Sequence, residues 1–145
     1  MSRFTVTPFL RRVLRVDAVL SGLTALALVA DAEPLAAWTG LPAGLLQATG
    51  LALVPWTAAL AWMGGRESLP VAALGTVIAL NFVWVLDTAL VAFGVLGAAQ
   101  TAGVAIAAVQ AVGTLVLAEL EWWGLKRAPR VGGVAAAPGR ARPVS

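Results

Sequence analysis

Residues 70–93 read PVAALGTVIALNFVWVLDTALVAF and contain a single charged residue, Asp87. About 20 apolar residues in a helix are enough to cross the hydrocarbon core of a bilayer, so this stretch predicts a transmembrane helix. Three further stretches have the same character, at residues 12–32, 44–63 and 98–120. Together the four stretches predict an all-α integral membrane protein built as a four-helix bundle.

The composition of the 145-residue chain supports this interpretation. The chain is 60% hydrophobic and 12% charged, with a mean hydropathy of +0.89, whereas soluble domains are roughly 25% charged. It contains no Cys and no His, which excludes disulfides, thiolate chemistry and the commonest metal ligand and general base. Nucleotide-binding loops and hydrolase motifs are also missing from the sequence. We therefore expect no enzyme, no metal site and no cofactor.

The basic residues lie on one side of the four-span arrangement. All ten are found at or before the start of the first span, between the second and third spans, or after the fourth: Arg3, Arg11, Arg12, Arg15, Arg66, Lys126, Arg127, Arg130, Arg140 and Arg142. The opposite loops carry only Asp31 and Glu33. The positive-inside rule then predicts that both termini lie in the cytoplasm.

The C-terminal residues 128–145 are rich in Gly, Pro, Ala and Arg and lack apolar periodicity. We expect residues 1–127 to form the bundle and the rest to be a disordered basic tail. The basic residues flank apolar spans and do not alternate with aromatic residues, so the expected partner is the lipid bilayer and not a nucleic acid. An alternative for the N-terminus is a signal peptide ending in the A-x-A motif at residues 30–32, although Asp17 inside the apolar run argues against it.

Four of the six tryptophans are predicted to anchor the protein at the membrane interfaces, where an amphipathic indole is favoured. Trp38 fits the outer interface, and the inner interface is expected to hold Trp62, Trp122 and Trp123. The other two tryptophans lie deeper, where their N–H groups are expected to find partners within the bundle.

Polar residues inside the spans are the candidate functional positions, because such residues are costly in hydrocarbon. They are Asp17, Gln47, Asn81, Asp87, Gln100 and Gln110. They either line a polar pathway or make interhelical contacts, since Asn and Gln also hydrogen bond between packed helices. Asp87 is far from the cytoplasmic end of its span and has no basic residue at its depth. This makes Asp87 the best candidate for a buried, titrating group.

Acidic residues also occur near the cytoplasmic ends of the first and last spans. Asp17 lies about 8 Å into the first span, within reach of Arg12 and Arg15, and Glu119 and Glu121 end the fourth span at a similar depth. We therefore expect a collar of salt bridges between acidic and basic residues that joins the first helix to the last.

Small multidrug-resistance exporters also have four short helices with an acidic residue in the first. Asp17 is too shallow for that family, and the one-sided basic charge excludes its dual topology. A set of short motifs covers most of the chain: Arg15-x-Asp17-Ala18, Ser21-Gly22, Leu41-Pro42, Asn81-x-x-Trp84, and Ala118-Glu119-Leu120 followed by Gly124-Leu125-x-Arg127. In these motifs the chain resembles uncharacterised small four-span bacterial membrane proteins. The resemblance implies a location in the bacterial inner (plasma) membrane, and it implies no activity.

Two functions follow from these observations. Short loops, stripes of small residues and the missing catalytic motifs favour a structural or accessory subunit that packs into a homo-oligomer or a larger membrane complex. The alternative is an oligomeric channel, or a proton- or cation-coupled transporter of a small solute, that uses the polar residues of the spans. The absence of Lys and Arg deep in the membrane argues against an anionic solute.

Overall fold

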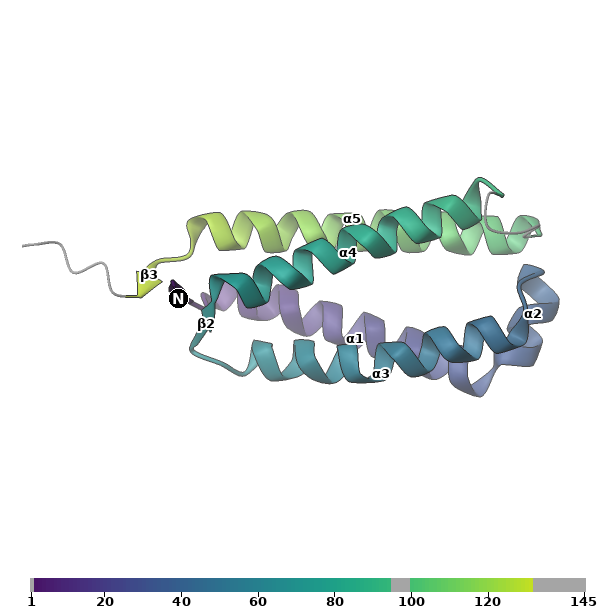
Figure 1. Cartoon of the computed structure of the whole chain (residues 1–145), viewed down its shortest axis with the longest axis horizontal. Helices are drawn as coiled ribbons and strands as arrows, with labels where there is room; N and C mark the ends of the chain where they lie inside the picture. The colour runs from purple at the N-terminus through teal and green to yellow at the C-terminus, as the bar shows by residue number, and fades with distance from the viewer. Residues whose placement is uncertain (1, 95–99, 132–145) are drawn as a thin grey trace, which may run out of the picture.

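The computed structural model describes residues 2–94 and 100–131. Four long helices run along its length (Figure 1): α1 (Pro8–Ala30), α3 (Ala43–Gly64), α4 (Val71–Ala92) and α5 (Thr101–Arg127). Each is long and apolar enough to cross a membrane. The four predicted spans are thus present as helices.

The ends of two of these helices differ from the prediction. The first helix begins at Pro8 and not at residue 12, because the Thr7 hydroxyl accepts a hydrogen bond from the Leu10 N–H at 3.2 Å and Pro8 occupies the first turn. Both features favour a helix N-terminus. The last helix continues beyond residue 120 to Arg127, which places Glu121 inside regular helix.

A short helix, α2 (Ala32–Thr39), occupies the connection between α1 and α3 that the sequence analysis treated as a loop. It ends at Gly40, whose φ of 75° lies in the left-handed region that favours glycine at a helix C-terminus. α2 covers the end of the bundle at which α5 begins (Figure 1).

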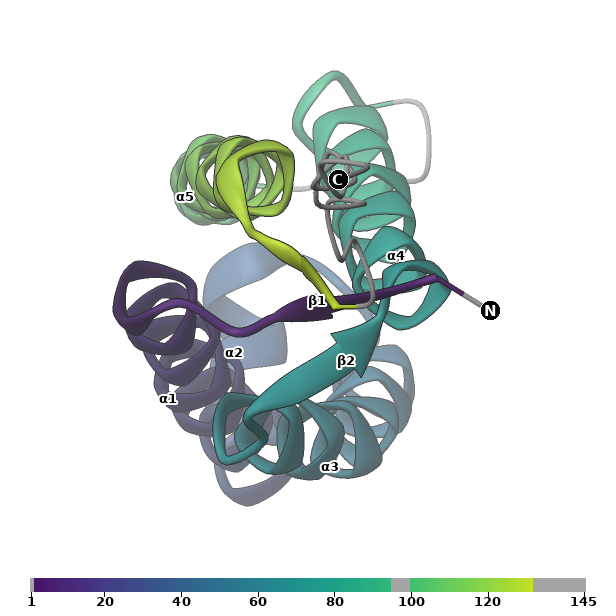
Figure 2. The same ribbon diagram turned by 90° about the vertical axis from the view of Figure 1, so that its left-hand side faces the viewer.

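The opposite end of the bundle carries a three-stranded antiparallel sheet that the sequence did not predict. Strand β1 (Arg3–Thr5) lies between β2 (Ser68–Pro70) and β3 (Arg130–Val131), and the strands cross the end of the bundle (Figure 2). Because β3 is paired with β1, the prediction of a disordered tail is wrong for residues 130–131. The rest of the predicted tail, residues 132–145, lies outside the described residues.

The hydrophobic core is concentrated next to this sheet. Phe4, from the central strand, is completely buried and packs with a set of buried leucines from β2 and the helices: Leu10, Leu14, Leu60, Leu69 and Leu74. Burial of these side chains explains why strands of two or three residues are stable here. The sheet fastens the N-terminus, the α3–α4 connection and the residues after α5 to one another.

The long helices pack as two pairs, α1 with α3 and α4 with α5 (Figures 1 and 2). Gly50 allows the close approach of α3 to α1, because a Cβ at this position would lie 2.8 Å from Leu28 Cβ and Val29 Cγ2. Contacts between the two pairs are less extensive. The candidate site lies between the pairs.

Candidate functional site

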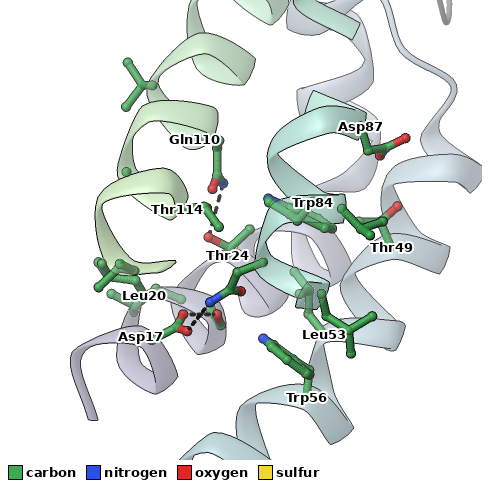
Figure 3. A pocket seen from close by; sticks show the side chains of 18 of the residues that line it. Asp17, Leu20, Thr24, Thr49, Leu53, Trp56, Trp84, Asp87, Gln110 and Thr114 are labelled. Atoms are coloured by element: carbon green, nitrogen blue, oxygen red, sulfur yellow. Dashed lines mark hydrogen bonds between the residues drawn. The ribbon is translucent and has the colours of Figure 1, made fainter. Parts of the chain in front are cut away.

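A cavity of about 910 Å³ separates the two helix pairs (Figure 3). All four long helices contribute to its wall, and most of the lining side chains are apolar. Its polar residues are Asp17, Ser21, Thr24, Thr49, Asn81, Asp87, Gln110 and Thr114, together with the indoles of Trp56 and Trp84. A second cavity of about 410 Å³ shares part of this wall and extends toward α2. Together they form a long space between the pairs.

One end of the larger cavity holds a cluster of three buried polar side chains from three helices. Asn81 of α4 donates one hydrogen bond from Nδ2 to Asp17 Oδ2 of α1 and another to Glu121 Oε2 of α5, both at 3.2 Å. Ser21 Oγ donates to the other oxygen of Asp17 at 3.0 Å. The exposed fractions are 3% for Asp17, 4% for Asn81 and 0% for Glu121. A single amide therefore bridges two buried carboxyl groups.

Glu121 has one unsatisfied atom in this cluster. Its Oε1 is buried and has no hydrogen-bond partner among the described residues. The Asn81 amide holds the carboxyl groups of Glu121 and Asp17 next to each other, because Nδ2 donates to both. Two negative charges that share one buried site repel each other, which favours a single proton between the two carboxyl groups. Groups of three or more acidic side chains suited to a metal ion are absent from the described residues.

The predicted collar of salt bridges is wrong for Asp17 and Glu121, whose hydrogen bonds come from Ser21 and Asn81. The prediction fails because the Asp17 and arginine side chains point in different directions around the axis of α1. Asp17 faces the interior of the bundle, whereas Arg12 and Arg15 on the same helix are exposed. The Arg15 stem passes beside α3 at Gly64, and Glu119 is exposed.

Of the other four predicted site residues, two line the cavities and two do not. Asp87 lines both cavities, but its side chain is exposed, so the expectation that it is buried is wrong. Gln110 also lines both cavities and donates a hydrogen bond to Thr24 Oγ1 at 3.3 Å, which links α5 to α1. Gln47 and Gln100 are exposed and are not among the described lining residues.

Glu121 is the residue of the cluster that the sequence analysis did not list as a site. A signal was present, because Glu121 lies on the same helical stripe of α5 as Gln110 and Thr114. Its depth along the helix alone predicted arginine partners for Glu121. The hydrogen bond to Asn81 shows that its partner lies on the neighbouring helix instead.

A backbone contact joins α2 to the start of α5 at the end of the smaller cavity nearest α2. The Gln100 N–H donates to the Thr39 carbonyl at 2.8 Å. Gly103 permits this approach, because a Cβ there would lie 2.5 Å from the same carbonyl oxygen. Thr39 and Gly103 both line the smaller cavity. This contact and the sheet join the two pairs at opposite ends.

Three of the four predicted interface tryptophans stack with basic side chains near the sheet. Arg66 Cζ lies 4.3 Å from the ring centroid of Trp62. Lys126 Nζ lies 4.8 Å from the ring centroid of Trp122, and Arg127 Cζ lies 3.5 Å from that of Trp123. All three tryptophans are exposed, as is Trp38 on α2.

No protein-family model, no curated protein and no solved structure matches the chain.

Proposed function

We propose that the protein spans a membrane four times, binds a small solute in the cavity between its two helix pairs and carries that solute across the membrane. The observation that supports this most directly is the Asp17–Asn81–Glu121 cluster at one end of a cavity of about 910 Å³. Buried acidic groups are costly in a membrane and typically mark solute or proton pathways. Small-molecule sites typically have volumes of about 300–1,000 Å³, so the cavity is large enough for a small solute.

In this proposal the sheet end of the bundle faces the cytoplasm. The described basic residues lie in β1, the first turns of α1, the α3–β2 connection, the last turn of α5 and β3, all toward this end. Asp31 and Glu33 lie at the opposite end, at α2. This distribution follows the positive-inside rule. The stacked tryptophans would lie at the cytoplasmic interface.

To carry a solute across the membrane, and not only bind it, the cavity must open to each face of the membrane in turn. The two helix pairs are suited to this because few hydrogen bonds connect them along the cavity. Asn81 to Asp17 and Gln110 to Thr24 are the described side-chain hydrogen bonds between the pairs along the cavity. Rocking of one pair against the other about such a site is a common form of alternating access.

The accessory role predicted from the sequence stays a prediction. One of its supports was the stripes of small residues as contact faces for a partner, but several small residues of the helices make contacts inside the chain. Gly50 packs on α1, Gly103 on α2, and a Cβ at Gly124 would lie 3.1 Å from Leu10 Cδ1. These glycines are therefore explained by folding, without a partner protein.

Single cysteines test the proposal cleanly, because the chain has no cysteine of its own. Thr24 lines both cavities and is the test position. Val54 is 53% exposed on the outer surface of α3 and is absent from the described cavity walls, so it is the matched control. A charged, membrane-impermeant thiol reagent is applied to right-side-out and inside-out vesicles that contain each variant.

We expect Thr24→Cys to react from both faces and Val54→Cys to react from neither. A Thr24→Cys variant that is unreactive from both faces would show a sealed bundle and would overturn the proposal. Reaction from one face only would show a binding cavity without passage, and would overturn the carrier role.

A further inference from the structure

The charges on the cavity wall indicate which solutes it accepts, and this inference rests on the proposed function. Asp17 and Asp87 are the charged residues among the described lining side chains, and no Lys or Arg is found with them. An anion in this space would meet only like charge at low dielectric, whereas a cation would be attracted. The electrostatics therefore select against anions.

The rest of the wall favours an organic cation over a small inorganic one. Trp56 and Trp84 both extend toward the space between the pairs (Figure 3), and apolar side chains such as Leu80 complete the wall. Aromatic faces attract quaternary and protonated amines, which are weakly hydrated. A strongly hydrated metal ion needs a compact set of oxygen ligands to replace its water, and the described residues contain no group of three acidic side chains that could provide one.

The acidic cluster has no cation of its own in the described structure. The charged groups on the elements around it are few. α3 contains no charged residue and α4 contains only Asp87. The remaining charged groups are exposed or turned toward the sheet end: Arg11, Arg12 and Arg15 on α1, and Glu119, Lys126 and Arg127 on α5. Two ionised carboxylates would therefore repel each other without a neutralising partner.

We propose that the cavity binds an organic monocation with an apolar body, and that its charge at Asp17 replaces one proton shared by Asp17 and Glu121. Asp17 lines the cavity and is positioned to meet the cation, whereas Glu121 lies behind Asn81 and is completely buried. Asn81 holds both carboxyl groups in place, because each of its two amide protons is donated to one of them.

The charges balance in this exchange. The empty site carries one proton on two carboxyl groups and has a net charge of −1. When the monocation binds, the carboxyl O–H bond breaks, its electron pair stays on the oxygen, and the proton passes to water in the cavity. Two carboxylates and one monocation again give −1. The site therefore exchanges one cation for one proton without a change in its net charge.

The test measures binding and proton release together in detergent-solubilised protein. The probes are phenyltrimethylammonium and its uncharged isostere tert-butylbenzene, titrated calorimetrically in two buffers with different ionisation enthalpies. The variants are Asp17→Asn and Glu121→Gln. Glu119→Gln is the matched control, because it makes the same chemical change at an exposed position two residues away on the same helix.

We expect the cation to bind wild type at least about tenfold more tightly than the neutral isostere, because only the cation is attracted to the Asp17 carboxylate and to the indole faces. About one proton should leave for each cation bound. Asp17→Asn should lose both the preference for the cation and the release of a proton. Glu121→Gln should bind the cation without releasing a proton, and Glu119→Gln should match wild type. Glu121→Gln keeps the test decisive even if Asp17→Asn does not fold.

Equal binding of the two probes would overturn the monocation class, and binding of the cation without proton release in wild type would overturn the exchange. If Thr24→Cys reacts from both faces but neither probe binds, this inference fails and the proposed function stands. If Thr24→Cys is also unreactive toward the thiol reagent from both faces, the proposed function itself fails.

Discussion

The contact between Gly103 and Thr39 allows a stability prediction with an internal control. A Cβ added at Gly103 would lie 2.5 Å from the Thr39 carbonyl oxygen and 3.1 Å from the Thr39 Cα and Cβ atoms. Real Cβ atoms do not approach backbone oxygens this closely, so Gly103→Ala must push α5 away from α2. Gly75 on α4 is the control, because a Cβ there meets nothing within 4 Å.

Opposing effects determine how much Gly103→Ala changes the free energy of unfolding. Alanine favours the helix over glycine by at most about 1 kcal/mol. Overpacking against backbone costs about 1–3 kcal/mol, and separating the helices also breaks the 2.8 Å hydrogen bond from Gln100 to Thr39, which contributes about 0.5–1.5 kcal/mol. The net expectation is a loss of about 1–3 kcal/mol for Gly103→Ala, against a gain of up to about 1 kcal/mol for Gly75→Ala.

The assay is thermal unfolding of wild type and both variants in the same detergent, followed by circular dichroism and by tryptophan fluorescence. Gly103→Ala should lower the midpoint and Gly75→Ala should leave it unchanged or raise it. Equal midpoints for the two alanine variants would refute the tight α2–α5 contact.

Three further predictions concern the cluster, the sheet and the orientation. Asn81→Leu removes the bridging amide from two buried carboxyl groups and should destabilise the protein by about 2–4 kcal/mol; an unchanged thermal midpoint would argue against the bridge. Phe4→Ala should cost about 3–5 kcal/mol, because the ring is completely buried beneath the sheet; a stability equal to wild type would show that the sheet does not hold the bundle end together. Glu33→Cys should react with an impermeant thiol reagent outside intact cells and Ser2→Cys only after permeabilisation, and the reverse pattern would invert the proposed orientation.

The four long helices could be predicted from the sequence because the length and hydropathy of an apolar run are local properties. The helix α2 and the strands could not, since each has few residues and depends on contacts distant in sequence. Phe4, for example, is paired with Leu69 and Arg130. No local pattern around Phe4 indicates either partner.

The site was only partly predictable for a related reason. Depth along a helix follows from the sequence, and it predicted arginine partners for Asp17 and for the acidic end of the last span. Which neighbour each side chain meets depends on the rotation and order of the helices in the bundle. That arrangement turns Asp17 and Glu121 toward Asn81 and leaves the nearby arginines exposed.

If Asp17 couples cation movement to proton movement through the cavity, the two movements can be measured together as flux in proteoliposomes. A pH-sensitive dye is enclosed in the vesicles and an inward gradient of phenyltrimethylammonium is applied. Protons should leave vesicles containing wild type or Glu119→Gln, whereas vesicles containing Asp17→Asn should behave like protein-free vesicles. Proton efflux of equal rate from wild type and Asp17→Asn, or no efflux from wild type above the protein-free level, would contradict this coupling.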